Sequence, residues 1–217
     1  MRIILLRHAE SLGNVDELAY CRVPDHALAL TEAGERQARA AAPAVRDVIG
    51  THPTAVYVSP YVRTLRTFEL LELGKVVERV VPEPRLREQD WGNLQDPVDQ
   101  EIQKRKRHDF GHFYYRLPYG ESGADVDDRV ASFLHELEHR VEADQSHPNT
   151  ALVVSHGLTM RLLCRRMFSW SIDLFESLSN PDHVDLRVLT FAGRKWRLDR
   201  PFEQWRESPD GTRQLPG

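Results

Sequence analysis

The feature that most constrains the fold is an alternation of short apolar runs with longer amphipathic segments. The apolar runs are rich in Ile, Val and Leu and are closed by proline or turn residues, which is typical of β-strands. They stand at residues 2–7, 55–60, 75–84, 150–156 and 184–198, the last with room for two strands around a turn at Ala192-Gly193. Consecutive apolar residues, as in IILL and LVV, favour central strands covered on both faces. The alternation therefore predicts an α/β sheet with helices on both sides.

Capping residues mark the ends of a predicted helix over residues 32–49. Thr31 is expected to cap its start and Gly50 to end it. Pro43 lies inside this pattern, so we expect the helix to kink or restart there. Further helices are predicted directly after the second and fourth strands, at residues 61–71 and 157–168.

The most regular helical pattern covers residues 125–141. Its apolar residues recur at spacings of three and four, which predicts one stripe packed on a sheet. The stripe consists of Val126, Val130, Phe133, Leu134, Leu137 and Val141. Ser122 and Asp125, just before it, resemble a capping box.

Residues 92–124 form the least regular stretch, rich in charged and aromatic side chains. We expect an insertion there that lies over one end of the sheet. After Arg200, Phe202 and Trp205 are expected to pack back on the body of the protein. The predicted organisation is a single domain over residues 1–205, which contains the insertion, and a loose tail over residues 206–217.

Composition excludes several classes of protein. The chain has 217 residues, of which 41% are hydrophobic and 29% charged, as in an ordinary globular protein. Its net charge of −4 argues against a general nucleic-acid binder. Two cysteines, Cys21 and Cys164, are too few for a disulfide framework, which favours a reduced, cytoplasmic protein. The apolar run at residues 3–6 is too short for a signal-peptide core, and no segment approaches the length of a membrane span.

Charged and nucleophilic side chains follow the predicted strands at the point where each strand ends. They are Arg7-His8 after the first strand, Ser59 and Arg63 after the second, Arg87-Glu88 after the third and Ser155-His156-Gly157 after the fourth. Ligands of open α/β sheets bind beyond the carboxyl ends of the strands, so these side chains are expected to share one site.

The residue types in this set fit phosphoryl chemistry. Arginine binds phosphate oxygens in bidentate fashion, and a neutral imidazole can act as a nucleophile toward phosphorus. Nearby arginines favour the neutral imidazole. A second, protonated histidine can stabilise charge on the transferring group, and a carboxyl group with a raised pKa can protonate the leaving oxygen. This scheme requires neither a metal ion nor a cofactor.

The same residues carry a family resemblance. RHAESLGN resembles the arginine-histidine signature of the histidine phosphatase superfamily, the phosphoglycerate mutase-like enzymes. LALTEAGERQA (28–38), SPYVRTLRT (59–67), LREQDWGNLQ (86–95) and VVSHGLTMR (153–161) are similar to its later motifs, in order. The resemblance is greatest to a phosphoglycerate mutase-like subgroup and spans most of the chain. It implies a three-layer α/β/α sandwich with a mostly parallel mixed sheet.

The resemblance also implies roles for individual residues. His8 is the implied nucleophile and Glu88 the implied proton donor. The phosphate pocket is implied to be completed by Arg7, Arg63 and His156, with Asn14, Ser11 and the Gly157 amide contacting phosphate or substrate. Ala9 and Asp96 depart from the family pattern, because both stand where relatives carry glycine, but neither change removes a catalytic group.

Several residues have a simpler alternative role. Ser11 and Asn14 are also suited to capping a following helix. Glu10 and Glu121 compete with Glu88 as proton donors. HELEH (135–139) matches a zinc-binding pattern, but the apolar stripe turns both of its histidines toward water, so we expect no zinc site.

The basic run KRKRH (104–108) leaves two interpretations open. It is either a solvated helix face, or one or two of its residues reach a second anionic group on the substrate. The neighbouring tyrosines Tyr114, Tyr115 and Tyr119 are more typical of lid packing than of stacking on a substrate.

The favoured function is a metal-independent phosphatase that hydrolyses phosphomonoesters through a phosphohistidine. A phosphoglycerate-type phosphomutase is the alternative. The insertion here differs in sequence from the insertion of dedicated mutases, which favours the phosphatase. A third hypothesis, a pseudo-phosphatase that only binds, conflicts with the intact set of arginines, histidines and glutamate. The expected partner is a small phosphorylated substrate, with neither nucleic acid nor membrane. The oligomeric state, a dimer among the options, stays open.

Overall fold

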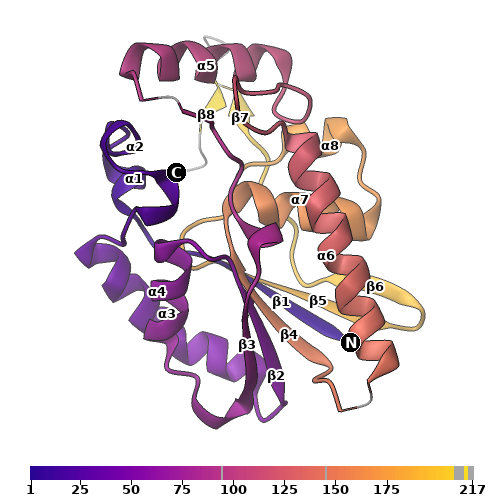
Figure 1. Cartoon of the computed structure of the whole chain (residues 1–217). Coiled ribbons are helices and arrows are strands. Elements are labelled where there is room, and N and C mark those ends of the chain that lie inside the picture. Colours follow the sequence, from indigo (N-terminus) through magenta and orange to yellow (C-terminus); the bar gives the residue numbers. More distant parts are fainter. Residues whose placement is uncertain (94, 145, 208–212, 215–217) are drawn as a thin grey trace.

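A six-stranded mixed sheet forms the centre of the protein (Figure 1). The structure, a computed structural model, describes residues 1–93, 95–144, 146–207 and 213–214. The strands lie in the order β3-β2-β4-β1-β5-β6. Their bounds are β1 Arg2–Arg7, β2 Thr54–Val58, β3 Val77–Pro82, β4 Thr150–Ser155, β5 Leu186–Ala192 and β6 Lys195–Leu198. β1 to β4 run parallel, whereas β5 and β6 pair antiparallel, so the predicted mostly parallel mixed sheet is confirmed.

Helices cover both faces of this sheet, which confirms the predicted three-layer architecture (Figure 1). Alternate residues of β1 serve the two faces: Ile4 and Leu6 join the apolar cluster of one face. That cluster includes residues of α3 (Glu32–Ile49) and α4 (Val62–Leu71). Residues 3 and 5 join the other cluster, which is built with α6 (Gly123–Ala143) and α7 (Gly157–Phe168).

The helix ends follow the capping residues of the sequence. The Thr31 side chain accepts a hydrogen bond from the Gly34 amide, and Gly50 ends α3 with a φ of 63°. The capping box of Ser122 and Asp125 is present at the start of α6. The predicted restart at Pro43 is wrong, because α3 continues through this residue. Pro43 is on the exposed face of the helix, as is Arg39, so the carbonyl of residue 39, which loses its intrahelical partner, can bond to water.

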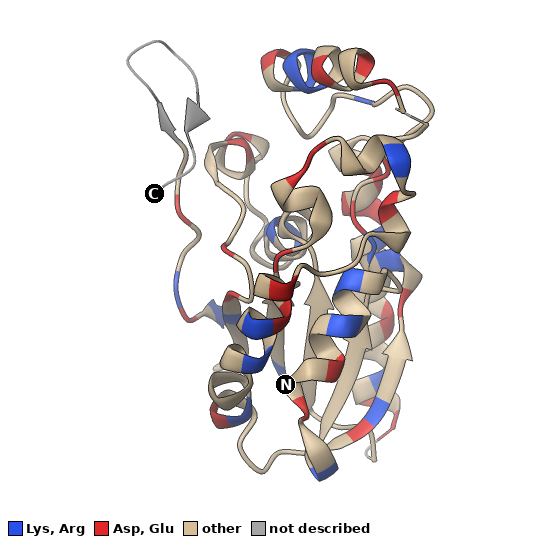
Figure 2. Cartoon of the chain, turned by 90° about the vertical axis from the view of Figure 1, so that its left-hand side faces the viewer, with Lys and Arg blue, Asp and Glu red and all other residues tan. Residues whose placement is uncertain are grey.

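The 92–124 stretch is more regular than predicted. It contains α5 (Pro97–Phe110), which Asp96 caps by accepting hydrogen bonds from the amides of residues 98 and 99. This cap accounts for the aspartate that stands in place of the usual glycine. Gln100 is the one buried residue of this helix. Because α5 has no buried apolar stripe, hydrophobic periodicity does not predict it. The helix lies beyond the end of the sheet, apart from the other layers (Figures 1 and 2).

Short elements complete the described chain. They are α1 (Leu12–Val15), α2 (Ala19–Arg22), α8 (Ile172–Ser177) and the 3-10 turns Asp25–Ala27, Gly74–Val76 and Pro84–Leu86. No helix among the described residues is long and apolar enough to cross a membrane.

The chain after β6 returns to the body of the protein, as predicted. Phe202 is buried in the cluster of the α6–α7 face, and the Trp205 amide donates to the Ser177 carbonyl. Of the predicted loose tail, the structure describes only β7 (Arg206–Glu207), which pairs with β8 (Arg213–Gln214). The remaining positions, 208–212 and 215–217, lie outside the described residues.

Candidate active site

Strand register places His8 and His156 side by side. β1 and β4 are adjacent and parallel, with Arg7 opposite Ser155. The next residue of each strand therefore leaves the sheet at the same edge. The His8 amide donates to the Ser155 carbonyl at 2.9 Å, and the two imidazole centroids are 5.1 Å apart.

A backbone carbonyl selects the tautomer of His8. Nδ1 of His8 lies 2.7 Å from the carbonyl oxygen of Ala9. A carbonyl can only accept, so Nδ1 carries the proton and Nε2 keeps its lone pair. His8 is 3% exposed, and the Ala9 amide is fixed in turn by Thr67 Oγ1 at 3.0 Å. The imidazole is thus held in the form that a nucleophile requires.

The charge state of His8 follows from its surroundings. Burial lowers the pKa of His8 well below its ordinary value, and the guanidinium groups of Arg63 and Arg7 lower it further. The ring is therefore neutral near pH 7.

A cavity of about 660 Å³ opens over this edge of the sheet, a volume suited to a small-molecule ligand. Its lining includes Arg7, His8, Asn14, Arg63 and Glu88, so five of the eight site residues predicted from the sequence meet in one place. The other three, Ser11, His156 and Gly157, are not among the described lining residues.

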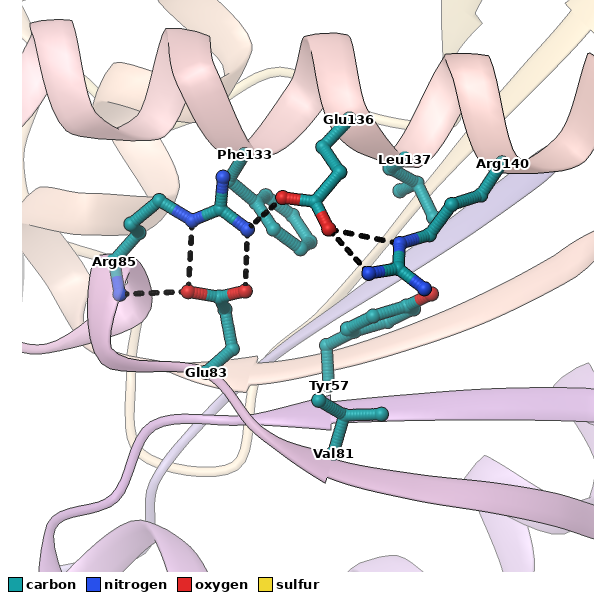
Figure 3. A pocket seen from close by; sticks show the side chains of 8 residues that line it. All are labelled: Tyr57, Val81, Glu83, Arg85, Phe133, Glu136, Leu137 and Arg140. Carbon is teal, nitrogen blue, oxygen red and sulfur yellow. Dashed lines mark hydrogen bonds and ion pairs between the residues drawn. The ribbon is translucent and has the colours of Figure 1, made fainter.

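A smaller hollow elsewhere has a different character (Figure 3). It measures about 40 Å³ and lies between the sheet and α6, space for about one water molecule. The charged side chains around it pair with one another: Glu83 with Arg85 at 2.7 Å, Arg85 with Glu136 at 2.6 Å, and Glu136 with Arg140. With these charges neutralised, the hollow offers no charge to a ligand, and the large cavity is the candidate site.

Two arginines of the large cavity are fixed by backbone oxygens. Arg7 Nη1 donates to the Pro181 carbonyl at 2.5 Å. Arg63 Nη1 donates to the Asp25 carbonyl at 2.7 Å and pairs with the Asp25 carboxylate at 2.8 Å. Each guanidinium group keeps further N–H donors, in an arrangement that suits the oxygens of an anion.

Glu88 is the carboxylate of the predicted set. Its Oε1 accepts a hydrogen bond from the Gln89 amide at 3.0 Å. Burial raises the pKa of the Glu88 carboxyl, which favours the protonated form that a general acid requires. Among the described residues that line the cavity, Glu88 is present, whereas its competitors Glu10 and Glu121 are not. Glu10 accepts from Thr31 at 2.5 Å, and Glu121 pairs with Arg129 at 3.0 Å.

His156 is fixed by one ring nitrogen and keeps the other. Burial and the charge of Arg63 lower its pKa well below the ordinary value, so the ring is neutral in the free protein and not protonated as predicted. Its Nε2 lies 2.8 Å from Ser59 Oγ. Nδ1 is buried without a hydrogen-bond partner among the described residues, an arrangement that costs free energy until a ligand or water fills it. Gly157 begins α7, and a Cβ at this position would lie 2.7 Å from the Asn180 side chain. The start of α7, where amide N–H groups attract anions, thus lies directly after His156.

Ser11 and Asn14 differ in their placement. Asn14 lines the cavity, and its Oδ1 accepts from the Ser11 amide at 2.9 Å and from Ser11 Oγ at 2.8 Å. Ser11 is fully buried and is not among the described cavity residues. The pair thus forms the capping arrangement that was one of the two interpretations, and it also fixes the side chain of Asn14, a residue of the cavity lining.

Sequence reasoning missed several residues of the cavity wall. They are Tyr20, Asp25, Tyr61, Trp91, Arg161 and Asn180. Most of them lie on short elements or loops, where no periodic pattern singles them out. Tyr114, Tyr115 and Tyr119 are not among the described cavity residues, and Tyr119 is 93% exposed. Lys104 and Arg107 of the basic run do line the cavity.

Two other sequence features have simple structural accounts. Ala9 is fully buried and packs with Ala38 and Leu70, and its backbone does not have a positive φ. The position therefore does not need glycine. His135 and His139 of the HELEH segment are exposed, as the stripe predicted.

Comparison with known proteins agrees with the geometry. Phosphoglycerate mutase-like protein AT74 of Arabidopsis thaliana is 42% identical over 204 residues, covering 87% of this chain and 64% of that protein. The chain thus spans less than two thirds of that relative. The broad-range acid phosphatase DET1 of Saccharomyces cerevisiae is 41% identical over 113 residues, covering 51% of this chain and 34% of that protein.

A solved structure shares the fold. The mycobacterial glucosyl-3-phosphoglycerate phosphatase in complex with VO3 has a TM-score of 0.71 and 25% identity, covering 91% of this chain and 96% of that one. Residues 3–204 match the family model of the histidine phosphatase superfamily (branch 1), which is nearly the whole chain. The protein that presents His8 at this sheet edge therefore belongs to the histidine phosphatase superfamily.

Proposed function

We propose that the protein is a phosphatase that hydrolyses phosphomonoesters through a phosphohistidine formed on His8. The observation that carries this proposal is the 2.7 Å hydrogen bond from His8 Nδ1 to the Ala9 carbonyl, which leaves the Nε2 lone pair available. Relatives named as phosphatases support it. Its natural substrate is then a small phosphorylated molecule, and its two cysteines, both free thiols, agree with a cytoplasmic location.

The phosphate is bound by cations and N–H donors at the sheet edge. Arg7 and Arg63 bind its oxygens, the Asn14 amide group and the amide at Gly157 add donors, and His156 stabilises its charge through Nδ1. Ser11 positions Asn14 through the two hydrogen bonds between them.

The first chemical step transfers the phosphoryl group to the enzyme. His8 Nε2 attacks phosphorus, and the bond between phosphorus and the ester oxygen breaks on the opposite side. The Glu88 carboxyl gives its proton to that oxygen, so the alcohol leaves uncharged. The products of this step are phosphohistidine, the free alcohol and the Glu88 carboxylate.

The second step regenerates the enzyme. The Glu88 carboxylate takes a proton from a water molecule as the water oxygen attacks phosphorus. The bond between phosphorus and Nε2 breaks, and its electron pair returns to His8 as the lone pair. Inorganic phosphate leaves, and Glu88 is protonated again.

Apart from the water molecule, every group that binds or reacts in these two steps is an amino-acid side chain or a backbone amide. We therefore propose a metal-independent reaction. Hydrolysis of a phosphomonoester is expected to be unchanged after dialysis against a chelator. Loss of turnover on chelation, restored by a divalent cation, contradicts the scheme.

A phosphomutase differs in the fate of the phosphohistidine. The decisive assay supplies 3-phosphoglycerate with bisphosphoglycerate and measures both free phosphate and the 2-isomer. The proposal expects free phosphate to be the main product. Rapid formation of the 2-isomer with little free phosphate assigns the alternative function.

A further inference from the structure

Arg107 is an arginine of the cavity wall without a carboxylate at ion-pair distance among the described residues, although the charges of Glu88 and Glu176 raise its pKa. Arg107 lies on α5 and lines the cavity. Its Nη2 donates to Gln89 Oε1 at 2.9 Å, and its guanidinium carbon lies 5.3 Å from the centre of the Trp91 ring. Its Nε is shielded from solvent and has no hydrogen-bond partner in the described part of the chain. Both contacts orient the guanidinium group, but neither supplies negative charge.

Two other arginines at the same end of the protein have carboxylate partners, whereas Arg7, which binds the first phosphate in the proposed function, contacts a carbonyl. Arg63 pairs with Asp25 at 2.8 Å, and Arg87 pairs with Glu121 at 2.5 Å. Arg107 has no ion pair in the described ranges of the chain. Removing such a cation from water costs free energy unless an anion is bound, so this position is poorly explained by stability alone.

A second guanidinium group reinforces the positive charge. Arg161 of α7 also lines the cavity and is 1% exposed. Its contacts are neutral oxygens: the Asn180 side chain at 3.0 Å and the carbonyls of Phe175 and Leu178 at 3.3 Å and 2.6 Å. Burial lowers the pKa of Arg107 to about 10 and of Arg161 to about 9, and the charge of Arg107 contributes to the shift at Arg161. The two cations therefore act on the same region of the cavity.

We propose that Arg107, reinforced by Arg161, binds a second anionic group of the substrate, either a carboxylate or a second phosphate. This inference rests on the proposed function, because it places the first phosphate at His8. The substrate class is then a phosphomonoester of an acidic molecule. Arg107 is the specificity-determining residue, because Nε and Nη1 of Arg161 already donate to the Asn180 side chain and to backbone carbonyls.

The placement of α5 fits this role. The helix lies beyond the sheet end, and its basic residues stand between acidic ones (Figure 2). Lys104 pairs with Glu17 across the cavity wall, whereas Arg105 and Lys106, on the same helix, are exposed. Both interpretations of the basic run thus apply, to different residues. Arg105 and Lys106 form the solvated helix face, and Arg107 is the residue that reaches the second anionic group.

The test uses a ladder of substrates in the full-length protein. The acids are ω-phosphorylated carboxylic acids of increasing chain length, beginning with 3-phosphonooxypropanoate. Each is compared with the alkyl monophosphate of the same length, which lacks the second anionic group, and with the α,ω-bisphosphate of that length. The alkyl monophosphate is called the matched alcohol below. Arg107→Gln removes the cation, Arg107→Lys restores a charge, and Arg105→Gln makes the same change on the exposed face of α5.

At the best length, Arg107→Gln is expected to lower kcat/KM for the acid or the bisphosphate by about tenfold or more. Turnover of the matched alcohol stays within about twofold, which also shows that the variant folds. Arg107→Lys recovers part of the loss, and Arg105→Gln has no effect. The arm with the larger loss identifies the group as carboxylate or phosphate. Equal losses on acids and alcohols, or no loss at any length, overturn the proposal.

Failure of the proposed function gives a different result. If the wild-type protein hydrolyses no member of the ladder, calorimetric titration with the same compounds tests the anion site alone. Binding of the acid or bisphosphate that weakens about tenfold in Arg107→Gln, with the alcohol unchanged, supports the site. Equal binding by the two proteins overturns it.

Discussion

The Nδ1–H group of His8 donates a hydrogen bond of 2.7 Å to the carbonyl oxygen of Ala9. The bond fixes the tautomer and the orientation of the ring at once, since a carbonyl accepts only from a protonated nitrogen. The acceptor of this bond is a backbone atom of residue 9, so the bond does not depend on the side chain there. This explains how alanine can stand where the family signature has glycine.

Replacing Ala9 by glycine is therefore expected to affect stability more than catalysis. The methyl group is fully buried against Ala38 and Leu70, so its loss costs about 1 kcal/mol of unfolding free energy. The carbonyl remains, so kcat stays within about twofold. Chemical denaturation and initial rates measure the two effects, and a large fall in kcat without a change in stability contradicts this account.

Glu88→Gln is expected to penalise poor leaving groups selectively. An alkoxide needs the proton of Glu88, so kcat/KM for an alkyl phosphate falls by about 10²–10⁴-fold. Nitrophenolate leaves without a proton, so p-nitrophenyl phosphate is affected far less in the phosphorylation step. Glu10→Gln serves as the control, because Glu10 is tied to Thr31 at 2.5 Å. Equal losses on both substrates mean that Glu88 is not the proton donor.

The pH dependence of kcat/KM follows from two opposite pKa shifts. The first step needs neutral His8 and protonated Glu88. The pKa of His8 is lowered by burial and by Arg63 and Arg7, so the ring stays neutral below pH 6.5. The pKa of Glu88 is raised by burial, so the acid form persists above pH 4.5. Activity on an alkyl phosphate is thus expected to be highest at acid pH and to fall as pH rises through the pKa of Glu88.

The matching experiment records that profile for the wild type and for Glu88→Gln. The alkaline fall due to Glu88 disappears in the variant, and any fall that remains reports another group, such as the substrate phosphate with its second pKa of about 6. A wild-type rate that rises steadily from acid to alkaline pH contradicts the assignment of Glu88 as the acid.

Gly34, which lies in the LALTEAGERQA motif, is a structural determinant near the site to which the sequence analysis gave no role. A Cβ at this position lies 2.0 Å from the carbonyl oxygen of Glu10, two residues beyond His8. Gly34→Ala forces α3 away from this segment and is expected to cost about 1–3 kcal/mol of unfolding free energy. Thermal denaturation tests this, and an unchanged melting midpoint shows that the approach of α3 to Glu10 is looser than described.

Most of the fold could be predicted from the sequence, because hydrophobic periodicity and capping residues are local signals. The strands, the ends of α3 at Thr31 and Gly50, and the stripe of α6 as far as Leu137 are confirmed, whereas Val141 is not buried. The α5 helix was missed because it buries almost nothing, and the restart at Pro43 was wrong because that residue faces water.

The site was predictable only in part, for the same reason. His8, Arg63 and His156 follow strands whose carboxyl ends meet, so topology alone brings them together. Arg107 is added by α5, which lies beyond the end of the sheet, and Arg161 by α7, which covers one of its faces. Their spacing in the sequence carries no information about which of them faces the cavity.

The most direct test of the central claim is the chemical identity of the phosphoenzyme. The protein is mixed with a phosphomonoester, quenched in alkali within one turnover and analysed by ³¹P NMR and by mass spectrometry of its peptides. The account predicts an acid-labile phosphoryl group on Nε2 of His8, because Nδ1 is occupied by Ala9, and no label in His8→Ala. A phosphoryl group on Nδ1 or on another residue, or turnover without any phosphoenzyme, contradicts it.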